Sequence, residues 1–208
     1  MRKIATGLHV HEKPSGTWTH YSWLLVRPQG NFLIACANVG DELAAIQALG
    51  GLSHVFITDI HFVSRWHGDI ANHCGATLVC HETDEKKVAA RCRPAKLETV
   101  GESRQFGKDL LGVHTPGHAD GGLCFLWNEG RRRLLFTGDF LCNGEGQWRV
   151  FCGKSKRKRM AQSLAAVERL GARGICAGIG DRDPGTFVAL GRETVSNLIH
   201  ETAERFCG

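Results

Sequence analysis

The sequence has no long hydrophobic run, although 42% of its 208 residues are hydrophobic. Its apolar stretches are only a few residues long, whereas a helix that spans a bilayer needs about 20. The charged N-terminal residues are not followed by the apolar stretch that a secretory signal peptide requires. We therefore expect a cytoplasmic protein with no membrane partner.

The nine cysteines include no C-x-x-C pair and are odd in number. Cys36, Cys80, Cys124 and Cys176 stand in apolar segments that are typical of strands. A disulfide framework is characteristic of small exported chains, and this chain resembles them neither in length nor in its start. We expect free, mostly buried thiols in a reducing compartment.

Internal repeats, low-complexity tracts and linker-like segments are also missing, and the charged fraction of 23% is ordinary for a globular protein. The length suits one substantial domain, which we expect to span residues 1–208. Short apolar segments alternate with helical patterns, which favours a layered α/β fold. Strands are expected at residues 4–10, 21–26, 32–36, 54–58, 76–80, 110–113, 122–127, 133–137, 147–151 and 174–177. Helices are expected at residues 41–49, at 160–170 and from residue 186 onward.

Much of the net charge of +5 comes from one basic run, K-S-K-R-K-R at residues 154–159. Met160, Leu164 and Val167 follow at helical spacing, so the run is expected to begin an amphipathic helix. Positive charge at a helix start opposes the helix dipole. The run is interpreted as a solvated helix face, with anion or nucleic-acid contact as the alternative.

Two turns in residues 110–140 carry polar residues next to glycine at strand ends. The first is H-T-P-G-H, which ends at His118, and the second is T-G-D, which ends at Asp139. Glycine lets the backbone turn tightly and approach a ligand closely. A histidine and an aspartate on loops above rigid strands are a plausible half of a metal site.

This pair of turns resembles the metallo-β-lactamase superfamily, where T-P-G-H supplies a histidine ligand and T-G-D an aspartate. The resemblance covers the chain from about Ile4 to Asp181. It implies a four-layered αβ/βα sandwich in which two mixed sheets face each other and helices lie outside. The site would lie at one edge, where the strand-end loops meet.

The family signature H-x-H-x-D-H corresponds here to D-I-H-F-V-S. Asp59 stands at the first histidine and His61 matches the second. Val63 and Ser64 replace the aspartate and the last histidine, and Ile179 replaces the histidine of the family's G-H-G turn. The resemblance implies that the ligands private to a second metal are all lost.

The positions that serve the first metal still carry candidate ligands, namely Asp59, His61, His118 and Asp139. Two imidazoles and two carboxylates suit one divalent metal, with zinc the default and iron or manganese as alternatives. A metal with an open position lowers the pKa of its water to about 7 in favourable sites. Asp139 would orient that water or bind the metal, and Asp59 would be a further ligand. We expect hydrolysis of a small ester, thioester, lactone or phosphoester.

Three other functions stay open. The chain is an inactive member that binds a ligand or partner through the old pocket, a mononuclear iron oxygenase, or a nucleic-acid-binding protein that uses residues 154–159. The last is not expected, because nucleases of the family carry an extra domain or a large insertion. His67 would replace the ligand missing at Ser64 if its segment folds inward. His81, His114 and Asp181 are expected to be structural or exposed, and His9, His11 and His20 are expected to lie at the surface.

Overall fold

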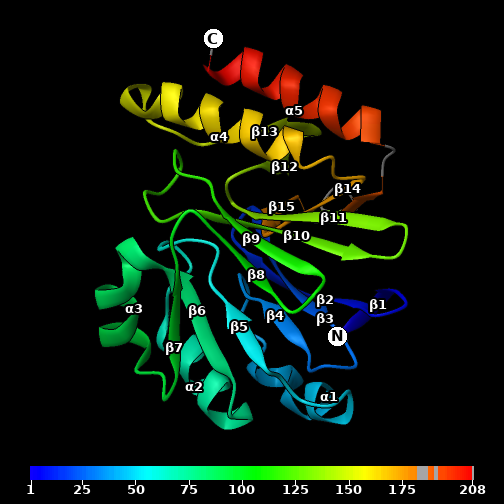
Figure 1. Ribbon diagram of the computed structural model, residues 1–208, viewed down its shortest axis with the longest axis vertical. Helices are drawn as coiled ribbons and strands as arrows, with labels where there is room; N and C mark the ends of the chain where they lie inside the picture. Colours follow the sequence, from blue (N-terminus) through cyan, green and yellow to red (C-terminus); the bar gives the residue numbers. More distant parts are fainter. Residues whose placement is uncertain (182–186, 190–191, 208) are drawn as a thin grey trace.

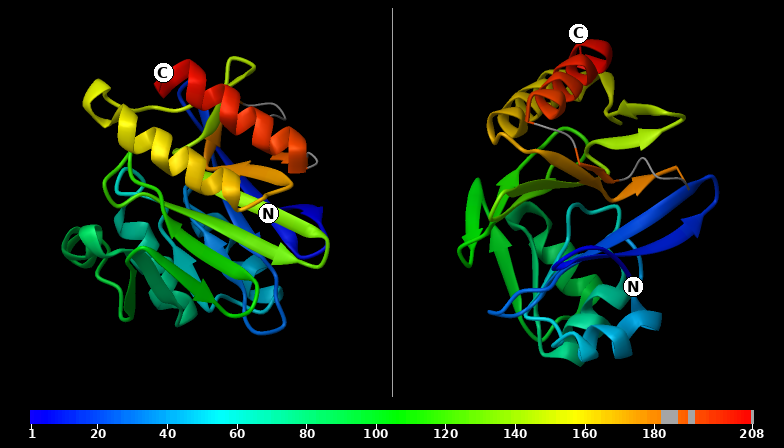
Figure 2. Two further views of the ribbon diagram at one scale, coloured as in Figure 1. Left: turned by 45° about the horizontal axis from the view of Figure 1, so that its top comes forward. Right: turned by 90° about the vertical axis from the view of Figure 1, so that its right-hand side faces the viewer.

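Two β-sheets lie between two groups of helices in a computed structural model of the chain (Figure 1). The structure describes residues 1–181, 187–189 and 192–207. In Figure 1, α4 and α5 cover one side and α1, α2 and α3 the other. The two further views show the same order of layers (Figure 2). No helix in the described part of the chain is long and apolar enough to cross a membrane.

The first sheet has ten strands, in the order β13-β12-β15-β3-β4-β5-β6-β7, with β2 on the other edge of β3 and β1 beyond it. Its central strands β4, β5, β6 and β7 are parallel, and the others pair mainly antiparallel. The strands are β1 (Arg2–Ala5), β2 (Leu8–Ser15), β3 (Trp18–Leu25), β4 (Phe32–Ile34), β5 (His54–Phe56), β6 (Thr77–His81), β7 (Leu97–Val100), β12 (Cys142–Gly144), β13 (Gln147–Arg149) and β15 (Ile179–Gly180).

The second sheet has six strands, in the order β16-β14-β11-β10-β9-β8. The strands β8 to β11 form an antiparallel meander, as the alternation of strands and turns predicts. β14 joins β11 in parallel. The strands are β8 (Ser103–Phe106), β9 (Leu110–His114), β10 (Leu123–Glu129), β11 (Arg132–Gly138), β14 (Gly174–Ala177) and β16 (Phe187–Ala189).

The helices cover the outer faces of both sheets. They are α1 (Leu43–Ala48), α2 (Arg65–Cys74), α3 (Glu85–Cys92), α4 (Arg157–Arg169) and α5 (Arg192–Cys207), with 3-10 turns η1 (Gly40–Glu42), η2 (Glu82–Asp84) and η3 (Lys154–Lys156). The apolar face expected on α4 is confirmed, since Met160, Leu164 and Val167 are buried.

Three hydrophobic cores lie between the successive layers of helices and sheets. One core lies between the sheets and includes Trp23, Phe56, Phe125 and Phe136. A second lies under α1 to α3, and a third lies under α4 and α5. Helices, sheet, sheet and helices therefore form the expected four-layered αβ/βα sandwich. All nine cysteines lie in the described part of the chain, and all are unpaired as expected.

Several boundaries differ from the sequence expectation. The single strand expected at residues 4–10 is a hairpin, because the chain turns at Thr6 and Gly7 between β1 and β2. Residues 187–189 form β16 beside β14, so the C-terminal helix begins later than expected. The expected start at Thr186 lies outside the described residues. The helices α2 and α3 and the strand β12 were not predicted, although Trp66, Ile70 and Cys74 of α2 stand at helical spacing.

A partly buried ion pair joins the two sheets at the end of the molecule where β3 turns into β4 and β8 into β9. The side chain of Arg27 donates from Nε to Asp109 Oδ2 at 2.7 Å and from Nη1 to the Gly30 carbonyl at 2.9 Å. Trp127 Nε1, from β10, donates to the same carboxylate at 2.9 Å. The Arg27 guanidinium also lies over the Phe32 ring, 3.7 Å from its centroid.

Replacement of this carboxylate should destabilise the fold. In Asp109→Ala, the buried Arg27 guanidinium loses its counter-ion and the Trp127 indole loses its acceptor. We expect a loss of about 2–4 kcal/mol in the free energy of unfolding, measured by urea denaturation. Asp69→Ala removes an exposed pair with Arg65 and should cost less than about 1 kcal/mol. Equal effects of the two changes would contradict a role for this contact in joining the sheets.

Candidate metal centre

Each of the four predicted site residues follows the end of a strand. Asp59 and His61 follow β5 of the ten-stranded sheet. His118 lies in the loop after β9, and Asp139 comes directly after β11 of the six-stranded sheet. The two sheets therefore contribute two residues each, and the loops meet at one edge of the sandwich.

Gly138 allows the two sheets to approach each other at this edge. Its φ of +57° is in the left-handed region, and a Cβ at this position would overlap the side chain of Thr58. The Thr58 carbonyl accepts a hydrogen bond from the Leu123 backbone at 2.7 Å, and the Gly138 carbonyl accepts one from Gly178 at 2.6 Å. The glycine of the T-G-D turn thus places Asp139 beside the loop that carries Asp59.

The side chains of Asp59, His61, His118 and Asp139 converge, with one ligand atom from each lying within 4.8 Å of the others. His118 Nε2 is 2.9 Å from His61 Nδ1 and 2.9 Å from Asp139 Oδ2. His61 Nδ1 is 3.1 Å from Asp59 Oδ1 and 3.9 Å from Asp139 Oδ2. In the described part of the chain, this is the one group of three or more such side chains that is arranged to hold a metal ion.

The chemistry of this donor set fits a bound cation. His118 Nδ1 lies 2.7 Å from the Phe151 carbonyl, which can only accept, so Nδ1 carries a proton. In the neutral ring, Nε2 then presents a lone pair toward Asp139 Oδ2, which is itself an acceptor. Two acceptors at 2.9 Å require a proton or a metal ion between them. A backbone acceptor on the far nitrogen is also the usual way in which a metal-binding histidine is oriented.

Burial and charge determine how this group titrates without a metal. Burial and the neighbouring Asp59 raise the pKa of Asp139 to about 7. Burial would lower the pKa of His118, but the hydrogen bond and charge of Asp139 raise it to about 9. The hydrogen bond with Asp59 likewise raises the pKa of His61. The carboxylates and imidazoles of the group therefore keep protons between them, and a bound cation would replace those protons.

Asp59 is held in one orientation by its own loop. Burial opposes its ionisation, yet hydrogen bonds around it lower its pKa. The backbone of His61 donates to Oδ1 at 2.8 Å, and Thr58 Oγ1 donates to Oδ2 at 3.1 Å. Asp139 differs, because its buried Oδ1 has no hydrogen-bond partner among the residues that the structure describes.

The positions that a second metal would use have other roles here. Val63 is buried in the core beneath α2. Ser64 is the residue that caps the start of α2, and Ile179 pairs with β3 as part of β15. These side chains stabilise the fold and offer no ligand.

His67 does not replace the ligand missing at Ser64. Its ring is fully buried, Nε2 donates to the Ala35 carbonyl at 3.1 Å, and Nδ1 accepts from the Ser64 backbone at 3.3 Å. Both ring nitrogens form hydrogen bonds with backbone groups, so His67 links the start of α2 to the end of β4. Because His67 is part of α2 and lies on its buried face, its side chain points into the core instead of toward the site.

The other candidates of the sequence are also outside the group. His81 and His114 stack on each other with ring centroids 3.9 Å apart, and Asp181 Oδ2 accepts from the Gly146 backbone at 3.3 Å. These three are structural, as expected. His20 is expected on the surface, but it is half-buried and packs edge-on against Phe62 at 5.7 Å.

A pocket of about 280 Å³ lies beside His61, and its walls include His20, Phe62, Trp66 and Cys36. Phe62 follows His61 directly, so its position beside the site could have been predicted from the sequence. His20 and Cys36 come from β3 and the end of β4, and their part in the pocket had no sequence signal. Of the four site residues, His61 is the one that lines this pocket.

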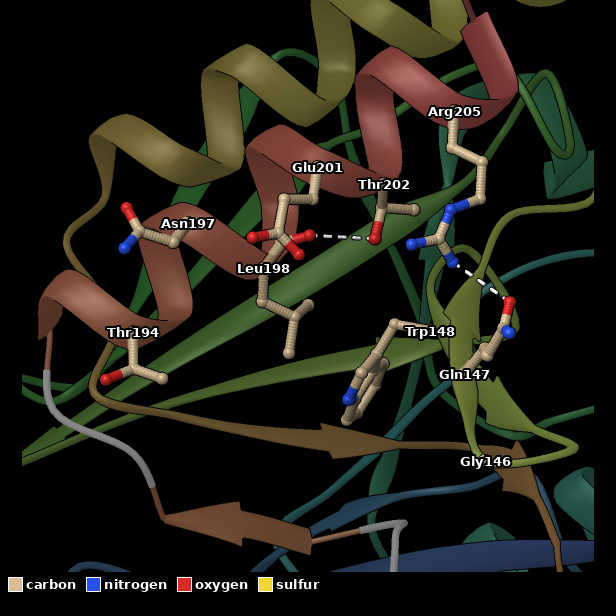
Figure 3. Close-up of a pocket in the computed structure, with 9 residues that line it drawn as sticks. All are labelled: Gly146, Gln147, Trp148, Thr194, Asn197, Leu198, Glu201, Thr202 and Arg205. Carbon is tan, nitrogen blue, oxygen red and sulfur yellow. Dashed lines mark hydrogen bonds between the residues drawn. The ribbon is translucent and has the colours of Figure 1, made fainter.

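A larger cavity of about 420 Å³ lies elsewhere, between β13 and α5 (Figure 3). Figure 3 shows Trp148 on one wall and the helix residues on the other, with Arg205 Nη1 donating to Gln147 Oε1 at 3.0 Å. None of the four site residues lines it. This cavity therefore cannot serve chemistry at the metal-binding group.

The buried His67 makes the fold sensitive to acid. Burial lowers its pKa from 6.5 to about 4, so the unfolded chain binds this proton more tightly than the folded chain. The stability associated with neutral His67 is complete above pH 6.5 and falls as the pH drops toward 4. The loss should be about 3 kcal/mol by urea denaturation across that range. His67→Gln should flatten this dependence, whereas His73→Gln on the exposed face of α2 should keep it.

Metal content tests the proposed ligand set directly. Wild-type protein purified without added metal should contain about one metal ion per chain by elemental analysis. His118→Ala removes one imidazole and should lose most of that metal. His114→Ala, in the same H-T-P-G-H segment but outside the group, should keep it. Unchanged metal content in His118→Ala would refute the ligand set.

Comparison with known proteins supports the architecture. The chain is 32% identical over 120 residues to an atrochrysone carboxyl ACP thioesterase of Aspergillus fumigatus, a match that covers 54% of this chain and 26% of that protein. It is 36% identical over 89 residues to the lactamase-like protein aptB of Emericella nidulans, which covers 39% of this chain and 27% of that protein. The matches thus span about a quarter of each curated relative. No family model matches the chain.

Solved structures match over almost the whole chain. A metallo-β-lactamase from Pontibacter korlensis superposes with a TM-score of 0.70 at 13% identity, covering 98% of this chain and 96% of that chain. A metallo-β-lactamase from Staphylococcus aureus gives a TM-score of 0.69 at 16% identity, covering 97% and 67% of the two chains. Together with the two sheets and their outer helices, these matches show that the chain has the metallo-β-lactamase fold.

Proposed function

We propose that the chain is a metal-dependent hydrolase that holds one divalent metal through Asp59, His61, His118 and Asp139. The observation that carries the proposal is the convergence of these four side chains within 4.8 Å from loops of both sheets. Zinc is the expected metal, because it suits imidazole and carboxylate ligands and is widely available. Iron and manganese suit the same ligands and are the alternatives.

A single metal is supported by what has replaced the other ligands. Val63 is part of the core, and Ser64 starts a helix. Restoring a second set of ligands at these positions would disturb both features. The described residues provide no second group of three or more metal-binding side chains.

Within the site, the chain's own residues orient the ligands and accept a proton. The Phe151 carbonyl holds the proton of His118 Nδ1 and leaves Nε2 free to bind. A divalent cation bound there would act as a Lewis acid and lower the pKa of water to about 7 in favourable sites. The carboxylate of Asp139 would bind the cation or accept a proton from a nucleophilic water.

The substrate that we favour is a small thioester, because one curated relative is a thioesterase. Water adds to the acyl carbon, the carbon–sulfur bond breaks, and a carboxylic acid and a thiol are released. The pocket beside His61 has aromatic walls in Phe62 and Trp66, which suit an apolar acyl group. Small esters, lactones and phosphoesters are alternative substrates for the same site.

Turnover of a short acyl thioester tests this function. Zinc-loaded wild-type protein should release thiol, as followed with a thiol-reactive dye. Asp139→Asn keeps the shape of the side chain but removes its charge, and should lower kcat/KM at least about 100-fold. Asp181→Asn makes the same chemical change outside the group and should leave kcat/KM near the wild-type value. Turnover that survives in Asp139→Asn would contradict the proposed site.

A further inference from the structure

The basic run at residues 154–159 lies next to the metal-binding loop. Lys156 Nζ and Arg159 Nη1 bond to the same oxygen of Asp120, at 3.1 and 3.3 Å. Asp120 is two residues beyond His118, within the same loop. Lys156 and Arg159 are therefore held beside the loop that carries His118.

The first turns of α4 support that loop along its length. Ser163 Oγ donates to the Pro116 carbonyl at 2.6 Å. A Cβ on Gly117 would lie 2.8 Å from Met160 Cα, so only glycine permits this approach. The Phe151 carbonyl, just before the run, accepts from His118. Loop and helix are thus packed as one unit.

Stability does not explain the charge of this segment. Positive side chains at a helix start oppose the dipole, and no side chain caps the first turn of α4. Lys154 and Lys158 are exposed and form no ion pair with any residue that the structure describes. Among the described residues, Asp120 is the one carboxylate that bonds to the run. Most of the positive charge is therefore directed at solvent.

An apolar residue stands beside the charges. Phe151 is 40% exposed, and it is the single large hydrophobic side chain exposed among the described residues. Its ring packs edge-on against Trp18 with centroids 5.9 Å apart. We call Phe151 and residues 154–159 together the rim surface. An aromatic anchor surrounded by charge of one sign is typical of a protein docking site.

We propose that the rim surface docks an acidic protein that presents a covalently attached acyl group to the site. Successive residues of a helix point about 100° apart, so Arg157, Lys158 and Arg159 cannot all converge on one phosphate. An acidic surface with dispersed carboxylates and an apolar residue matches both the spread of the cations and Phe151. Complementary charge of this kind mainly increases the rate of encounter. Turnover of the docked acyl group rests on the proposed thioester hydrolysis, whereas docking of the acidic protein does not.

The test compares one acyl group on two carriers. Zinc-loaded full-length protein is given acetyl-loaded acyl carrier protein, which is acidic, or the neutral acetyl thioester of N-acetylcysteamine. Lys154→Glu/Lys158→Glu reverses two exposed charges of the rim surface. Lys108→Glu/Arg131→Glu serves as the matched control. It reverses two exposed charges in the β8–β9 and β10–β11 turns, at the ends of these strands that lie away from the site.

The rim variant should lose at least about tenfold in kcat/KM for the carrier-bound group and stay within about twofold for the small thioester. The difference should shrink at about 0.5 M salt, and the control variant should behave as wild type with both substrates. An equal loss on both substrates, or no loss on either, would overturn docking at this surface.

A binding titration separates the two proposals. If wild-type protein hydrolyses neither substrate, the proposed function fails, and binding of the carrier protein decides the docking alone. Salt-sensitive binding that weakens at least about tenfold in the rim variant would support it. No binding of the carrier, or binding of an oligonucleotide in its place, would overturn it.

Discussion

Two carboxylates buried side by side are the constraint around which this site is built. Asp59 and Asp139 come from different sheets and are both almost removed from water. Like charges in such a place are costly unless protons or a cation neutralise them. His61 and His118 supply protons in the metal-free chain, and their nitrogens lie where a cation would bind. The same crowding of two buried carboxylates and two imidazoles suits the group for a metal.

The residues that follow His61 contribute to the fold instead of the site. Val63 adds to the core under α2, while Ser64 and His67 form the start of that helix. His67 illustrates why proximity in sequence to a metal motif is a weak guide to function. Its two ring nitrogens bond to backbone groups, and its burial keeps it neutral. Val63, Ser64 and His67 therefore act as structural elements of this fold.

The loop that carries His118 depends on the helix that follows it. Pro116, Gly117, His118 and Asp120 each contact α4 or the segment just before it. The geometry of the metal-binding group and the placement of the basic rim are therefore set by the same packing. A partner that binds the rim would meet the site at a fixed distance, because the loop and the helix cannot move independently without breaking these contacts.

The sequence was enough to recognise the fold and to nominate the four residues that the structure brings together, because the T-P-G-H and T-G-D turns are local patterns that follow recognisable strands. It also determined the apolar face of α4 through its helical period. Three other features became visible in three dimensions alone: His67 points into the core, His20 lines the pocket, and the Phe151 carbonyl orients His118. These outcomes depend on contacts between segments far apart in the chain, and neither periodicity nor spacing records which distant backbone group a side chain will meet.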